Sequence, residues 1–95
     1  MIVNHAASVF EAFCRSQIPE AQRFWENDVE LDLVGPDPQN PGGILAAEVK
    51  WRRLSAAERE KTLKHLQMEW TRSSLNSKYP KVRFDVFDAS HVLAL

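Results

Sequence analysis

Three polar residues of this sequence stand where two strands are expected, and their types suit chemistry on phosphates. Asp32 lies in the alternating stretch 29–34, whereas Glu48 and Lys50 lie in a second alternating stretch, residues 44–51. Two carboxylates from neighbouring strands offer the hard oxygen ligands that Mg²⁺ accepts. Lys50 falls on the same side of its strand as Glu48, placed to hold a phosphate oxygen or to orient and activate an attacking water.

The weight of this pattern comes from its context, since a bare Glu-x-Lys triplet is expected by chance in about a third of chains of this length. Here the triplet lies in an otherwise apolar strand, where charges are expensive to bury unless they pair or bind an ion. A hairpin loop joins this strand to the one that carries Asp32, so the two polar faces coincide. We therefore expect Asp32 and Glu48 to hold Mg²⁺, or Mn²⁺ in its place, with a backbone carbonyl near Val49 completing the protein's share.

A helix and a hairpin precede these residues in the predicted order of elements. Apolar residues at three-and-four spacing predict a helix over residues 6–18, ended by Pro19, with Glu11 near the edge of its buried stripe. A hairpin follows, with strands over residues 22–26 and 29–34 and a tight turn between them. The predicted helix stripe is Ala6, Val9, Phe10, Phe13 and Cys14.

Strict alternation fixes the faces expected for the next two strands. Residues 35–43 hold three of the five prolines and all three glycines, so they form a loop between those strands. In the strand before the loop, one face is expected to carry Val29, Leu31 and Leu33, and the other Glu30, Asp32 and Val34. In the strand after it, one face is expected to carry Leu45, Ala47, Val49 and Trp51, and the other Ile44, Ala46, Glu48 and Lys50.

A second helix and a last strand complete the fold. The helix begins at the capping box of Ser55 and Glu58, buries Leu63, Leu66 and Trp70, and fades at about residues 72–75. A strand follows over residues 82–87, and residues 92–95 extend the sheet or pack on it. The order helix, three strands, helix, strand predicts an α/β fold with a mixed sheet flanked by helices, in which the last crossover favours a parallel pair.

Length and composition indicate one globular domain, residues 1–95, with 44% hydrophobic and 26% charged residues. A core of this size is modest, so a homodimer or a partner domain is a natural way to complete it. The single cysteine, Cys14, excludes a disulfide framework and favours a reducing, cytoplasmic compartment. Neither a signal peptide nor an apolar run of membrane-spanning length is present, so no membrane is expected.

The net charge of -1 hides an asymmetry between the two halves of the chain. Residues 1–49 carry eight acids and two bases, whereas residues 50–95 carry ten bases and five acids. An acidic site beside a basic surface suits a metal-dependent enzyme that acts on phosphates. The simpler interpretation is that the halves attract each other or that the helix faces are solvated.

These features resemble the PD-(D/E)XK nuclease superfamily, which includes restriction endonucleases and archaeal Holliday junction resolvases. The resemblance lies in the order of elements, with Asp32 on the second strand and Glu48-Val49-Lys50 on the third. More narrowly, Phe10-Glu11, residues 30–34 and Glu48-Val49-Lys50-Trp51 resemble a domain of unknown function at the C-terminus of archaeal and bacterial DEXX-box P-loop ATPases.

The resemblance implies a restriction-endonuclease-like αβββαβ fold and a role for each polar residue. Asp32 and Glu48 would be metal ligands, Lys50 the catalytic lysine, and Glu11 the first-helix acid that assists the metal. Leu31 stands where the superfamily's motif name has proline, a residue that many members lack. No Gly-x-x-x-x-Gly-Lys-[Ser/Thr] motif occurs, so a P-loop ATPase domain is an expected partner, in cis or in trans, rather than part of this chain.

Two main hypotheses about function follow. The first is a magnesium-dependent nuclease domain acting on DNA, and the second is a non-catalytic docking or dimerisation module of an ATPase that retains the nuclease fold. A third, minor hypothesis is a defence component that acts on RNA.

The remaining distinctive residues favour structural roles. The three histidines, His5, His65 and His91, fit no metal-ligand spacing, and Trp51 and Trp70 are expected to fill the core. Arg52, Arg53, Arg59 and Lys61 line a phosphate-binding rim or form a solvated face.

Overall fold

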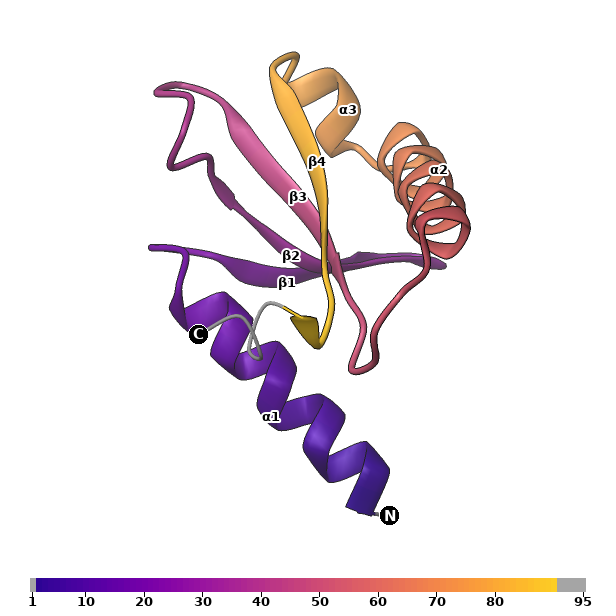
Figure 1. Ribbon diagram of the computed structural model, residues 1–95. Coiled ribbons are helices and arrows are strands. Elements are labelled where there is room, and N and C mark those ends of the chain that lie inside the picture. Colours follow the sequence, from indigo (N-terminus) through magenta and orange to yellow (C-terminus); the bar gives the residue numbers. More distant parts are fainter. Residues whose placement is uncertain (1, 91–95) are drawn as a thin grey trace.

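The computed structural model describes the backbone of residues 2–90 and the side chains of residues 9–90. Its elements follow the predicted order of helix, three strands, helix and strand, with one added short helix (Figure 1). They are α1 (Ile2–Ser16), β1 (Gln22–Glu26), β2 (Val29–Pro36), β3 (Ile44–Val49), α2 (Ala56–Arg72), α3 (Leu75–Lys78) and β4 (Val82–Phe87). The predicted α/β class with a mixed sheet is therefore confirmed.

The four strands form one sheet in the order β1-β2-β3-β4. The first two pairs are antiparallel hairpin neighbours, and β3 pairs with β4 in parallel, as the crossover through α2 predicts. Asn27 turns the first hairpin with φ 55°, a left-handed conformation that asparagine tolerates better than most residues. The prediction for residues 92–95, and any role of His91, lie outside the described residues.

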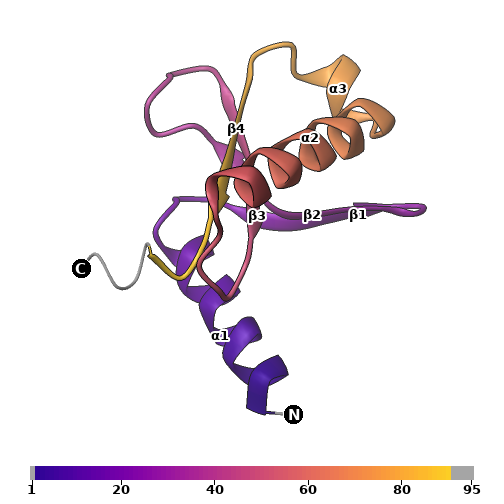
Figure 2. The ribbon, with the colours of Figure 1, turned by 45° about the vertical axis from the view of Figure 1, so that its right-hand side comes forward.

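The sheet carries a hydrophobic core on each of its faces, because α1 and α2 lie on opposite sides of it (Figure 2). Phe10 and Cys14 of α1 pack on one face, and Leu66 and Trp70 of α2 pack on the other. The capping box predicted for α2 is present, with the Ser55 side chain accepting a hydrogen bond from the Glu58 amide. The sheet residues facing α1 are Leu33, Leu45, Ala47 and Val49, and those facing α2 include Val29, Leu31 and Ala46.

The stripe predicted for α1 is only partly buried. Phe10 and Cys14 are buried, whereas the Val9 and Phe13 side chains are 54% and 36% exposed. The first half of α1 extends beyond the sheet, so the sheet covers only part of this helix (Figure 1). The prediction that Val9 and Phe13 belong to the core was wrong.

The alternation predicted for β2 is broken by a β-bulge at Asp32 and Leu33. Gln22 pairs with Val34 but Phe24 pairs with Leu31, so two residues of β2 lie opposite Arg23 alone. The extra residue reverses the side-chain direction, so Leu31 packs on the α2 side and Leu33 on the α1 side. The prediction that Val29, Leu31 and Leu33 share a face was therefore wrong, because it assumed an unbroken period of two.

Gly35 allows β2 to pass close to the segment that follows α1. A Cβ added there would lie 2.9 Å from the Ala21 Cα, a backbone atom that cannot move aside without shifting the chain. We expect Gly35→Ala to lower the free energy of unfolding by about 1–3 kcal/mol, as measured by urea denaturation. Gly43→Ala is the control, because its nearest contact is the Asn40 carbonyl oxygen at 3.2 Å in a loop, and it should cost less. Equal losses in the two variants would contradict the close packing of Gly35.

Candidate functional site

Asp32 connects the bulge in β2 to the end of β3. Its Oδ2 accepts a hydrogen bond of 2.9 Å from the Val49 amide, beyond the last paired residues of the two strands, Leu33 and Ala47. The carboxylate thus takes the place that a backbone carbonyl would hold if the ladder continued. The bulge turns Asp32 toward β3, where its charge acts on Glu48, and bulges often re-aim side chains in this way near functional sites.

Glu48 occupies the face of β3 that looks toward α2, as its alternation with Ala47 and Val49 predicts. Its side chain is only 12% exposed. Burial, followed by the neighbouring charge of Asp32, raises the pKa of the Glu48 carboxyl, and the charge of Lys50 opposes this. The charge of Asp32 on β2 therefore acts on the Glu48 carboxyl of β3.

Glu11 reaches the same group from α1. Partial burial and then the charge of Asp32 raise the pKa of the Glu11 carboxyl, while Arg23 and Arg15 lower it. Its Oε1 lies 3.9 Å from Nη1 of Arg15, one turn further along the helix. Asp32 therefore acts electrostatically on both Glu11 and Glu48. Glu11 lies on α1, whereas Glu48 lies on the face of β3 that looks toward α2.

Lys50 follows the last residue of β3. Its amide donates to the Phe87 carbonyl of β4 over 2.8 Å, so the backbone at this point is still fixed to the sheet. Its charge lowers the pKa of Glu48, yet the half-buried Lys50 forms no ion pair with any residue in the described range 9–90. Lys50 is thus held near the carboxylates without being neutralised by direct contact with one of them.

His65 and Glu69 of α2 join this group, and the sequence did not predict them. Nδ1 of His65 lies 3.9 Å from Oε1 of Glu48, and its Nε2 lies 3.5 Å from Oε1 of Glu69. The sequence analysis gave His65 a structural role and no place near Glu48, so this contact is an addition from the structure. The sequence feature that could have indicated this contact is the i, i+4 spacing of His65 and Glu69 on a helix that must run back over β3. Spacing alone, however, does not show which side of the helix faces Glu48.

Asp32 and Glu48 offer carboxylate oxygens of the kind that a hydrated divalent cation accepts. Oδ1 of Asp32 accepts no hydrogen bond from the described residues, and Glu48 is a largely buried carboxylate whose charge a cation would stabilise. Among residues 9–90, no group of three or more His, Cys, Asp or Glu side chains is arranged to hold a metal ion. Mg²⁺ needs only one or two protein carboxylates, because it keeps several of its waters.

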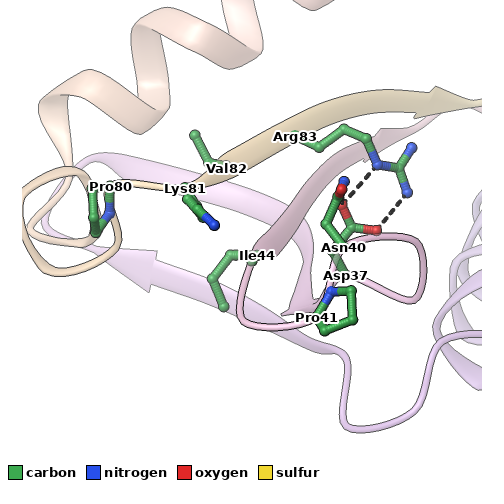
Figure 3. Close-up of a pocket in the computed structure, with 9 residues that line it drawn as sticks. Asp37, Asn40, Pro41, Ile44, Pro80, Lys81, Val82 and Arg83 are labelled. Atoms are coloured by element: carbon green, nitrogen blue, oxygen red, sulfur yellow. Dashed lines mark hydrogen bonds and ion pairs between the residues drawn. The ribbon is translucent and has the colours of Figure 1, made fainter.

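A pocket of about 350 Å³ lies at the opposite end of β3 and β4, where both strands begin. Figure 3 shows Asp37 and Arg83 joined across it by two hydrogen bonds, each 2.9 Å long. The Asp37 side chain is 1% exposed, so this ion pair closes the loop between β2 and β3 against β4. We attribute a structural role to it, because the acids and the lysine described above lie at the other end of β3.

Comparison with family profiles shows the family to which this chain belongs. The profile of the family DUF234, described as archaeal and bacterial proteins of unknown function, matches residues 2–62. The chain belongs to this family. The part matched to DUF234 contains Glu11, Asp32, Glu48 and Lys50 and ends within α2. Comparisons with curated proteins and with solved structures returned no significant match. No helix in residues 2–90 is long and apolar enough to cross a membrane.

Proposed function

We propose that this chain is a metal-dependent nuclease domain that hydrolyses phosphodiester bonds in DNA. One observation carries the proposal: a bulge turns Asp32 to the Val49 amide, beside the buried Glu48 and ahead of a Lys50 that has no ion-pair partner in the described part of the chain. A purely structural arrangement has no need of two mutually repelling carboxylates and a lone ammonium. A site that binds a cation and a phosphate does.

Each residue has a role in this proposal. Asp32 and Glu48 hold Mg²⁺ or Mn²⁺, which when bound lowers the pKa of a coordinated water and screens charge on the phosphate. Lys50 contacts a phosphate oxygen or orients the attacking water, and its ammonium matters most as negative charge develops on the phosphate. Glu11 adds negative charge from α1 that supports cation binding.

The finer fold assignment and the partners belong to the same proposal. The order α1-β1-β2-β3-α2-α3-β4, with Asp32 on β2, Glu48 on β3 and Lys50 directly after β3, supports a restriction-endonuclease-like αβββαβ fold. DNA is the proposed substrate, and a P-loop ATPase domain is the proposed partner, in cis or in trans. The acidic first half and the basic second half of the chain support a phosphate substrate brought to an acidic, metal-binding site.

Metal binding is the first test, with the melting temperature as its measure. Saturating Mg²⁺ or Mn²⁺, at about 100 times its Kd, should stabilise the wild type by about 2.7 kcal/mol. For a domain of this size that corresponds to a rise in Tm of about 10 °C or more. Glu48→Gln should raise Tm without metal, because the ionised Glu48 is disfavoured by burial, and should lose most of the metal-dependent shift.

Glu60→Gln is the matched control for this experiment. Glu60 is 70% exposed on α2, and its one ion pair within residues 9–90 is with Lys64, at 3.7 Å, so its replacement should change neither the metal-free Tm nor the shift. A wild-type Tm that ignores both metals, or a full shift retained in Glu48→Gln, would remove the assignment of Asp32 and Glu48 as ligands.

A docking or dimerisation module is the second candidate function, favoured by the surface of α1. Val9 and Phe13 are exposed there, and a second copy of the chain or an ATPase domain would cover them. In this alternative, Lys50 serves only as an ion-pair partner of Glu48, yet it forms no such pair among the described residues. That observation ranks the nuclease above the module.

A further inference from the structure

Trp51 lies next to Lys50 and is open to solvent, contrary to its predicted place in the core. Its side chain is 44% exposed, whereas Trp70 is 2% exposed, as predicted. β3 ends at Val49, so Trp51 lies beyond the strand. An indole exposed beside a candidate catalytic residue calls for an explanation other than packing.

The Trp51 ring is held in place from one side. Its centroid lies 4.8 Å from that of Phe10, with the ring planes tilted by 49°, and Phe10 itself is buried in the core between α1 and the sheet. Figures 1 and 2 both show the chain that leaves β3 running beside α1. A buried anchor of this kind fixes the orientation of the exposed part of the indole, which lowers the entropic cost of stacking a ligand on it.

Cationic side chains surround the exposed indole in the sequence. Lys50 precedes it, and the exposed Arg53 follows two residues later; neither forms an ion pair within residues 9–90. Arg52, in contrast, pairs with Glu58 at 2.6 Å. Two cations without an ion pair, on either side of an exposed aromatic ring in the sequence, match the two parts of a nucleotide, a phosphate and a base with a flat aromatic face.

We propose that Trp51 stacks on an unpaired base, so that the domain binds nucleic acid with single-stranded character next to the bond it cuts. The inference rests on the proposed function, because it places the nucleotide beside Lys50. Bases within a continuous duplex are stacked on each other and do not present a free face to a side chain. The substrate class is therefore a single strand, a flap or the fork of a branched structure, rather than an intact duplex. Arg53 contacts the backbone phosphate of the same strand.

Binding of labelled single-stranded and blunt duplex DNA of one sequence, measured by fluorescence anisotropy in EDTA, tests the inference without cleavage. The wild type should prefer the single strand. Trp51→Ala should weaken single-strand binding about tenfold or more and leave duplex binding nearly unchanged, whereas Trp51→Phe should retain most of it. Arg53→Ala should reduce the dependence of single-strand affinity on salt by about one phosphate contact.

Two further variants make the result specific. Trp51→Leu keeps an apolar cover over Phe10 without a flat aromatic face, so it should stay folded and bind as weakly as Trp51→Ala. Trp25→Ala is the matched control, because Trp25 is 66% exposed on β1, with the Arg23 guanidinium 5.1 Å from its ring centroid, and its loss should not alter binding.

The outcomes separate this inference from the proposed activity. Single-strand binding that is unchanged in Trp51→Leu, or that falls equally for the duplex, would overturn the stacking role of Trp51 even if the protein cleaves DNA. Trp51-dependent binding with no cleavage in Mg²⁺ or Mn²⁺ would overturn the nuclease assignment and leave a single-strand binding surface.

Discussion

Lys50→Ala is expected to keep metal binding and to lose cleavage by at least about 100-fold, whereas Asp32→Asn loses both. The carboxylate supplies charge to the bound cation in the resting state. The ammonium contributes mainly when negative charge develops on the phosphate, so its removal affects the rate and not the affinity for metal. The measurements are nicking of plasmid and branched DNA with Mg²⁺ or Mn²⁺, and the metal-dependent shift in Tm.

The structure offers controls for both parts of this prediction. Lys61→Ala removes an exposed ammonium from α2 and should leave cleavage unchanged. Lys50→Arg keeps the charge but changes its shape, so partial activity is expected if charge on the phosphate is what Lys50 stabilises. Asp32→Asn also perturbs the hydrogen bond from the Val49 amide, so its metal-free Tm must be compared with that of the wild type.

Three results would decide between the two proposed functions. Cleavage by Lys50→Ala at the wild-type rate would remove the catalytic role of Lys50. Well-folded, metal-loaded wild type that cuts none of several DNA forms would end the nuclease assignment. A loss of Tm in Lys50→Ala with no effect on any cleavage would favour the docking module.

The faces of β3 could be predicted from sequence because the strand is regular. Its six residues pair without interruption with β4, so simple alternation correctly places Glu48 opposite to Leu45, Ala47 and Val49. The hairpin connection also predicted correctly that β2, which carries Asp32, pairs with β3. What alternation could not show is where the strand stops, and Trp51 is half-exposed because β3 ends two residues before it.

The bulge in β2 could not be read from the sequence, because it is a property of pairing. Residues 29–33 alternate apolar with acidic without a break, and only the register against β1 shows that Asp32 and Leu33 share one partner, Arg23. The consequence is large, since the bulge divides Leu31 and Leu33 between two cores and turns Asp32 toward β3. The place of His65 beside Glu48 depends likewise on how α2 packs on the sheet, which its spacing alone does not determine.

Asp37→Ala is expected to destabilise the fold by about 2–4 kcal/mol without altering the chemistry at the far end of β3. Asp37 accepts hydrogen bonds from the Gln39 amide, from Asn40 and, through two nitrogens, from Arg83 (Figure 3). Removing it leaves the loop between β2 and β3 unattached to β4. The cost stays below that of a fully buried pair, because the Arg83 side chain is 31% exposed and can still be hydrated.

The pH dependence of this loss provides its internal check. Hydrogen bonds from Arg83, outweighing the effect of burial, hold the pKa of the Asp37 carboxyl well below its usual range. A carboxyl whose pKa is lowered by folding stabilises the folded state above its unfolded pKa, near 4, and this contribution fades as the pH falls toward the folded value. The difference in unfolding free energy between wild type and Asp37→Asn, measured by urea denaturation, should therefore be constant above about pH 5 and shrink below about pH 4. Other carboxyls with lowered pKa values, such as Glu58 at about 2, contribute equally to both proteins and cancel in the difference.

A difference that is independent of pH down to the acid transition would show that the charge of Asp37 contributes little. The hydrogen bonds that Asp37 accepts from Gln39 and Asn40 would then hold the loop alone.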